Sequence, residues 1–205
     1  MSDRQEAVAE ALGRAGRAFG MHRWEEALAA YEEVLSLDGD AVEARAQAGR
    51  CRLRLGRDEE AVADFEAAIA AAESPEASWW VELGDAYLNQ DNEDQAAANF
   101  QAALEKDHNC AQAFAGMGIL YLRHKSYQMA KAALERAVAL GPLNSDIAPA
   151  RINLAIAYCY LGQFEQAMDE ISAARNLGYP VDPSFREMLE KQLIDTRQTE
   201  KEELS

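Results

Sequence analysis

Small and bulky apolar residues recur along this chain with a long, nearly constant period. A small alanine returns at intervals of 34, 35, 34 and 37 residues, and a bulky apolar side chain follows each alanine four positions later. Residues four apart share one face of an α-helix, so each pair predicts an apolar helix face. The pairs are Ala27 and Tyr31, Ala61 and Phe65, Ala96 and Phe100, Ala130 and Leu134, and Ala167 and Ile171. Such a period predicts stacked helical hairpins, because one hairpin alone cannot bury its apolar face.

The segment 77–110 carries the fullest version of this pattern. Its first half reads W-x2-L-G-x2-Y through Trp80, Leu83, Gly84 and Tyr87. The run 90–92 (Gln-Asp-Asn) predicts a turn, and Ala96 then opens the apolar stripe of a second helix. The segment resembles a tetratricopeptide repeat. The resemblance implies an all-α fold, a right-handed α-α superhelix of about five helical hairpins with a C-terminal capping helix.

Extending this frame predicts a single solenoid over residues 1–197. Its repeats are expected near 8–41, 42–76, 77–110, 111–147 and 148–181, with a capping helix at about 183–197 and a frayed acidic tail at 198–205. Asp182 and Pro183 form the expected start of the capping helix, and Ser74 with Pro75 the expected start of a helix in repeat three.

Two sets of positions vary in a way that bears on packing. Small residues are expected where the two helices of a hairpin approach closely, and these are Ala15, Gly49, Gly84, Gly118 and Ala155. Repeats one and two are irregular in their first helices. Ala18 and Arg52 stand where Tyr87, Tyr121 and Tyr158 stand in the other repeats.

Composition narrows the classes of function. The chain has 36 acidic and 20 basic residues, a formal net charge of −16, which opposes binding to nucleic acid or to anionic membranes. The N-terminus does not read as a secretory signal, and no apolar run approaches the ~20 residues that cross a bilayer. The three cysteines, Cys51, Cys110 and Cys159, form neither a zinc pattern nor a disulfide framework. These features predict a cytoplasmic protein without membrane insertion.

The sequence offers no arrangement suited to catalysis. It has no phosphate-binding loop, no HExxH motif and no nucleophile with a base at a recognisable spacing. The three histidines fall near helix ends in separate repeats, which favours turn or helix-dipole roles over a shared metal. We therefore expect no enzyme activity, no cofactor and no metal.

The resemblance implies a concave groove lined by the first helix of each repeat. Matched position by position, the candidate groove residues are Arg50, Leu53, Arg54, Val81, Asp85, Asn89, Ile119, Leu122, Arg123, Ile152, Asn153, Ile156 and Tyr160. The set becomes more apolar toward repeats four and five. A contiguous apolar surface of this kind indicates a binding role, although single members can simply pack between neighbouring helices.

Arginines concentrate in repeat two, and two interpretations of them stay open. Arg50, Arg54 and Arg57 are spaced to share one helix side. They either receive a carboxylate of a bound peptide or pair within the protein with Glu43, Glu82 or Asp85. The second interpretation is the simpler one. The carboxylate clamp of chaperone-binding tetratricopeptide proteins is not reproduced, because Ala46, Arg50 and Glu82 occupy its positions in the frame that starts from repeat two.

Trp79 has a less regular place, since the matching position is usually small in this family. It stands beside Trp80, which has a core position in the pattern, and at the junction left by the longer second repeat. We expect Trp79 to fill that junction rather than to act as an exposed binding anchor.

The resulting hypothesis is a non-enzymatic scaffold that binds a peptide or helix of another protein in its groove, as a monomer or with weak self-association. Two alternatives stay open. One is a chaperone-like holder of a secreted or membrane-inserting client, similar to tetratricopeptide chaperones of bacterial secretion systems. The other is a self-assembling scaffold, as magnetosome-associated tetratricopeptide proteins are, in which one chain's first helix docks into a neighbour.

Overall fold

The computed structural model describes residues 3–141 and 147–203, and this part of the chain contains helices and turns but no strand. The helices group into two compact units, Met1–His108 and Asn109–Ser205. In the first unit they are α1 (Asp3–Gly20), α2 (Trp24–Leu37), α3 (Val42–Arg54), α4 (Asp58–Ala71), α5 (Ala77–Asn89) and α6 (Glu93–Lys106). In the second they are α7 (Ala111–Arg123), α8 (Tyr127–Leu140), α9 (Ala148–Tyr160), α10 (Phe164–Asn176) and α11 (Pro183–Glu203).

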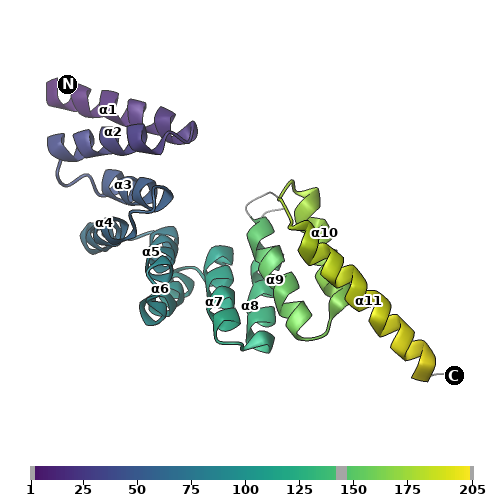
Figure 1. The fold of residues 1–205 in the computed structure, drawn as a ribbon. Helices are drawn as coiled ribbons and strands as arrows, with labels where there is room; N and C mark the ends of the chain where they lie inside the picture. Colours follow the sequence, from purple (N-terminus) through teal and green to yellow (C-terminus); the bar gives the residue numbers. More distant parts are fainter. Residues whose placement is uncertain (1–2, 142–146, 204–205) are drawn as a thin grey trace. The chain divides into compact units, whose positions relative to one another are not determined.

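The helices pair in chain order into antiparallel hairpins (Figure 1). Inside the first unit the hairpins are α1–α2, α3–α4 and α5–α6, and the second helix of one hairpin packs on the first helix of the next one in the unit, α2 on α3 and α4 on α5. Inside the second unit α7–α8 and α9–α10 do the same, and α11 covers α10. The expected all-α hairpin fold is thus confirmed. The division between the units falls at the expected boundary between repeats three and four, and a single continuous solenoid over residues 1–197 stays a prediction.

Each hairpin closes where a small residue of the first helix faces a bulky residue of the second. A methyl group added at Gly84 would lie 2.6 Å from the Phe100 ring, and one at Gly118 would lie 2.5 Å from Leu134. At Gly49 the nearest atoms of Phe65 are 3.1 Å away. Ala15 and Ala155, the small residues of the remaining hairpins, are fully buried. The expected steric role of these positions is therefore confirmed.

The turn inside each hairpin has the same backbone conformation. His22, Gly56, Asp91, Lys125 and Gly162 all have a φ between 55° and 72°. The next residue donates its N–H to the carbonyl five positions back, at 2.8–2.9 Å, as Asn92 does to Tyr87 and Ser126 to Tyr121. This is a Schellman motif, which satisfies the free carbonyls at a helix end. Only two of the five turns use glycine, so the other three hold an ordinary residue in the left-handed region.

A carboxylate joins successive hairpins at three junctions. The hydroxyls of Tyr87 and Tyr158 donate to Glu66 (2.6 Å) and Glu135 (2.8 Å), each on the preceding second helix. Arg52 stands in the same place in the second hairpin, and its guanidinium pairs with Glu32 at 2.8 Å. The irregular first helix of repeat two therefore keeps the junction with a different donor. Arg52 also pairs with Asp64 inside its own hairpin.

The two neighbouring tryptophans differ in burial. Trp79 is 3% exposed and packs with Phe65, Ala46 and Leu83, whereas Trp80 is only half-buried against this cluster. Trp79 thus fills the core, as expected. The expected helix start at Ser74 and Pro75 is wrong, because α5 begins at Ala77. The Ser74 hydroxyl instead accepts a hydrogen bond from Lys106, at 2.9 Å, and the residue directly before α5 is Glu76.

The C-terminal helix begins where Asp182 and Pro183 predict it, with the Asp182 carboxylate accepting the backbone N–H of Ser184 at 2.9 Å. Leu189 is fully buried against α9 and α10, and Phe185 packs beside it. The helix continues to Glu203, so the tail expected to fray from residue 198 is helical that far. Its Lys, Arg, Gln and Glu residues are good helix formers, which favours this extension. The expected end of repeat four is near residue 147, and residues 142–146 just before this point lie outside the described part of the chain.

We expect Gly118→Ala to lower the free energy of unfolding by about 1–3 kcal/mol, because the new methyl group overlaps Leu134. Gly16→Ala, in α1, is the matched control, since a methyl group added at Gly16 would have no atom within 4 Å apart from its own helix backbone and chain neighbours. There the helix propensity of alanine should raise stability by up to about 1 kcal/mol. Urea denaturation of both variants measures the difference, and equal midpoints would contradict the close approach.

Lys125→Gly should raise the free energy of unfolding by about 0.5–1 kcal/mol, because glycine adopts the left-handed turn conformation without strain. Gly162→Ala should have the opposite effect in the equivalent turn of the next hairpin. Thermal melts followed by circular dichroism would show opposite shifts, and shifts of the same sign would argue against a strained turn.

Candidate functional site

The candidate groove residues of the first unit form a polar surface along α3 and α5. The Arg50 guanidinium binds Glu82 through two contacts of 2.7 and 2.9 Å and donates to the Ser78 hydroxyl at 3.1 Å. Arg57 pairs with Glu60 at 2.6 Å. The expected pairing within the protein is thus confirmed for Arg50 with Glu82, whereas Arg57 pairs with Glu60, which was not among the expected partners. The main N–H donors of both guanidinium groups are thus already hydrogen-bonded within the protein.

Arg54 differs from its neighbours. It is exposed, and in the described residues it has no hydrogen-bond or ion-pair partner. Burial raises the pKa of two carboxyl groups of α5, Glu82 and Asp85, and the charge of Arg54 opposes part of this rise. Of the clustered arginines that sequence placed in the groove, Arg54 alone keeps a free guanidinium in this part of the structure.

Asp85 has the most perturbed carboxyl group of this surface. Its side chain reaches solvent, but the surrounding helices displace much of the water around it. This desolvation, together with the charge of Glu82, raises the pKa of Asp85 to about 7, and Arg54 offsets only part of the rise. Asp85 is therefore a mixture of neutral and ionised forms near neutral pH.

The remaining groove candidates of this unit mainly support structure. Val81 is 6% exposed, so its side chain is not available at the surface and the expected groove role does not hold for it. Leu53 is half-buried against the Phe65 cluster. Asn89 is exposed and donates to Asp58, at the start of α4, at 2.8 Å.

The candidate residues of the second unit form a more apolar surface on α7 and α9. Ile152, Ile156 and Tyr160 are spaced four apart, so they line one stripe of α9. Half-buried side chains accompany this stripe, and these are Ile119, Leu122 and Asn153. Arg123 lies at the end of α7 and takes part in polar interactions of its own.

Tyr160 has the most exposed side chain among the apolar candidates of this unit, with 63% of its surface accessible. Its ring stacks on that of Tyr127, at the start of α8, with centroids 4.2 Å apart and planes 6° from parallel. Sequence reasoning missed Tyr127. The signal that could have found it is positional, because Asn89 and Asp58 join equivalent places in the first unit.

The described residues contain no group of three or more His, Cys, Asp and Glu side chains that could hold a metal ion. His22 packs edge-on against Trp24, and the ring of His108 bonds the Leu104 carbonyl. Burial raises the pKa of the Cys51 and Cys159 thiols to about 11, which keeps both protonated and weakly nucleophilic at neutral pH. Across the part of the chain that the structure covers, none of the helices has the length and apolarity to span a membrane.

The raised pKa of Asp85 predicts a pH-dependent stability. A folded pKa above the unfolded value favours folding at low pH, and this advantage is lost as the pH rises through about 7. Asp85→Asn removes the cost of ionising this group. Its melting temperature should thus exceed that of the unaltered protein little at pH 4 and increasingly up to pH 8. Glu59→Gln, on the exposed side of α4, controls for the loss of one negative charge. A gain that is the same at all pH values would contradict the assignment.

Comparison with known proteins gives this architecture a family. Two family profiles described as tetratricopeptide repeat match residues 18–80 and 81–145. Among proteins of curated function none gives a significant match. Several solved structures share the fold. They include PilF of Pseudomonas aeruginosa (TM-score 0.76, 16% identity, 95% of this chain and 86% of that one). TTC0263 of Thermus thermophilus is also similar (0.68, 20%, 93% and 99%). YrrB, described as having an unusual peptide-binding site, is a third (0.58, 22%, 86% and 92%). The profiles together span more than half of the chain, which therefore belongs to the tetratricopeptide repeat family.

Proposed function

We propose that this protein is a non-enzymatic interaction scaffold and that the α7–α9 surface of the second unit binds a peptide or amphipathic helix of another protein. The observation that carries the proposal is the exposed Tyr160 ring, which stacks on Tyr127 and is flanked by the half-buried Ile152 and Ile156. Rigid aromatic side chains beside apolar ones are typical anchors of protein interfaces. That the family generally binds proteins supports the proposal in its coarser form.

The contrast with the first unit favours this choice of surface. On the equivalent face of the first unit, Arg50 is already paired with Glu82 and Asn89 already donates a hydrogen bond to Asp58. A ligand would have to displace these polar contacts, and exchanging one polar contact for another yields little net affinity. On the α7–α9 surface a ligand instead removes apolar area from water, which is the main source of binding free energy.

Charge supports a protein partner over a nucleic acid. Residues 1–108 hold 24 of the 36 acidic and 10 of the 20 basic residues, a net charge of −14, and residues 109–205 are close to neutral at −2. The first unit would therefore repel nucleic acid and anionic lipid. The weakly charged second unit is compatible with an apolar ligand, and its surface suits both a scaffold and a chaperone-like holder.

End-to-end self-assembly is the less favoured alternative. On the outer side of α1, Arg14 stands where α5 and α9 have the buried Leu83 and Leu154. On α11, Arg186 pairs with Glu190 at 2.8 Å on an exposed face. Charged terminal faces are what repeat proteins use to stay in solution, so we propose a monomer or weak self-association.

The test is to purify the partner from the native host with the unaltered protein and then to measure its affinity for variants. We expect Tyr160→Ala to weaken binding about 30-fold, the effect of losing an interface anchor of about 2 kcal/mol. Tyr160 is exposed, so the fold should be retained, and circular dichroism verifies this. Met129→Ala is the matched control, because Met129 is 53% exposed on α8 and belongs to no candidate surface.

Two results would contradict the proposal. One is equal affinity of Tyr160→Ala and the unaltered protein for the partner. The other is selective loss of binding in Arg54→Glu, which would place the site on the polar surface of the first unit instead.

A further inference from the structure

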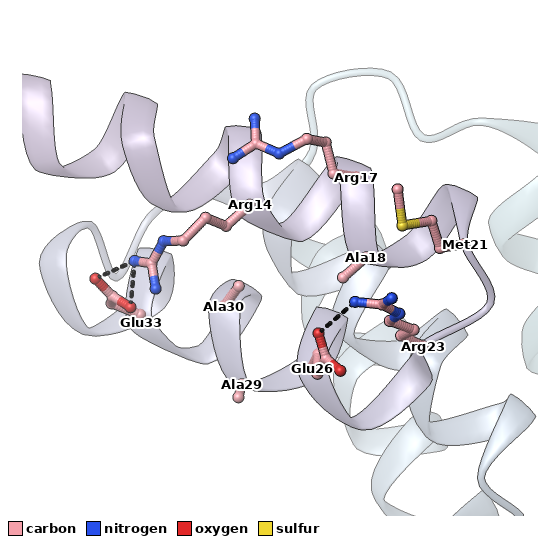
Figure 2. Close-up of a pocket in the computed structure, with 9 residues that line it drawn as sticks. All are labelled: Arg14, Arg17, Ala18, Met21, Arg23, Glu26, Ala29, Ala30 and Glu33. Carbon is pink, nitrogen blue, oxygen red and sulfur yellow. Dashed lines mark hydrogen bonds and ion pairs between the residues drawn. The ribbon is translucent and has the colours of Figure 1, made fainter.

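The open side of the α1–α2 hairpin holds a pocket of about 510 Å³ (Figure 2). Its floor is made of small side chains, Ala18 from α1 with Ala29 and Ala30 from α2. Three arginines, Arg14, Arg17 and Arg23, surround this floor together with two glutamates. The pocket lies on the outer side of α1, away from the α3–α5 and α7–α9 surfaces, and was not foreseen from the sequence.

The equivalent side of three other first helices is covered by a helix that brings a carboxylate. α2 covers α3 and sets Glu32 against Arg52, and α4 covers α5 and sets Glu66 against Tyr87. In the second unit α8 covers α9 and sets Glu135 against Tyr158. In all three covering helices the glutamate directly follows a buried bulky residue, namely Tyr31, Phe65 or Leu134. These three junctions show that this side of a first helix is covered by a helix that carries a glutamate next to a bulky apolar residue.

In the α1–α2 hairpin the equivalent side of the first helix, α1, is not covered by a preceding helix of the described residues. Ala18 occupies the place of Arg52, Tyr87 and Tyr158, and its short side chain leaves the pocket. In the described residues of this unit α1 packs mainly against α2, and no helix lies over the pocket. A cationic donor is still present, because Arg17 lies one residue before Ala18 on the same helix.

The charges of the pocket leave one cation free. Arg14 binds Glu33 with contacts of 2.7 Å to both carboxylate oxygens, and Arg23 pairs with Glu26 at 3.5 Å. Arg17 has no hydrogen-bond or ion-pair partner among the residues that the structure describes, and in Figure 2 its guanidinium stands apart from both pairs. A free guanidinium next to an apolar floor complements a carboxylate on an amphipathic helix.

We infer that this pocket is a docking site for an acidic amphipathic helix of another protein, which lays its apolar face on Ala18, Ala29 and Ala30 and sets a carboxylate against Arg17. Nucleic acid and anionic membranes are poor occupants, since the net charge of −14 on this unit repels extended polyanions. A second copy is disfavoured for the same reason, because it would bring another unit of −14. A single helix adds only a few negative charges and places one of them at the cation.

The probe is a stapled, fluorescein-labelled peptide that copies α4, residues 58–71, because this helix already covers an equivalent side through Glu66. Fluorescence anisotropy with the full chain should show saturable binding. Arg17→Glu should weaken it at least about tenfold, as expected for replacing a charge-assisted contact by a repulsive one. A second peptide with Glu66→Arg should bind the Arg17→Glu protein better than it binds the unaltered protein.

Arg175→Glu is the matched control, because Arg175 is exposed on α10, and within the described residues it has no partner. It should leave the affinity of the peptide unchanged. Tyr160→Ala should do the same, which separates this site from the proposed α7–α9 surface. The inference is overturned by absence of saturable binding, by equal effects of Arg17→Glu and Arg175→Glu, or by failure of the charge exchange. Sedimentation velocity provides one more outcome: a dimer that Arg17→Glu dissociates would identify a second copy as the occupant and refute the assignment to another protein.

Discussion

The close approach of two helices at a residue without a large side chain is the constraint on which this structure depends. Gly84 against Phe100 and Gly118 against Leu134 leave no room for a methyl group. Helices that pack this closely bury the bulky partner completely and fix the position of one helix along the other. Each hairpin thereby becomes a rigid element, and the surfaces that consecutive hairpins present are determined by it.

Once the hairpins are rigid, the junctions between them can use polar contacts without losing register. Arg52 replaces a tyrosine at one such junction and still reaches the carboxylate of the preceding helix. The exchange is possible because the apolar core positions the two helices, while the polar contact only has to satisfy a carboxylate at a partly exposed edge. The same tolerance explains how the first hairpin can present arginines on its outer side, where no helix of its own unit needs to pack.

Equivalent faces of the two units carry side chains of different chemistry. In the first unit, the face of α3 and α5 holds the Arg50–Glu82 pair and the Asp85 carboxyl group, whose pKa is raised to about 7. In the second unit, the face of α7 and α9 has the exposed ring of Tyr160 beside half-buried isoleucines. The charge of the chain is divided in the same way, with most of the negative charge in residues 1–108. Position in a repeat therefore fixes where a side chain lies, and its chemistry fixes which ligand the face suits.

The sequence by itself determined the all-α fold class, the succession of helical hairpins and the small residues at the close contacts. These follow from periodicity and residue size, which act locally along a helix and repeat from one hairpin to the next. It also placed Trp79 in the core correctly. Only the tertiary structure decided that Val81 is buried, that Arg50 is paired while Arg54 is free, and that Tyr127 supports Tyr160. The pocket beside Arg17 likewise emerged only there. Each of these depends on which side chains from different helices meet across about 3–5 Å, and spacing along one chain does not contain that information.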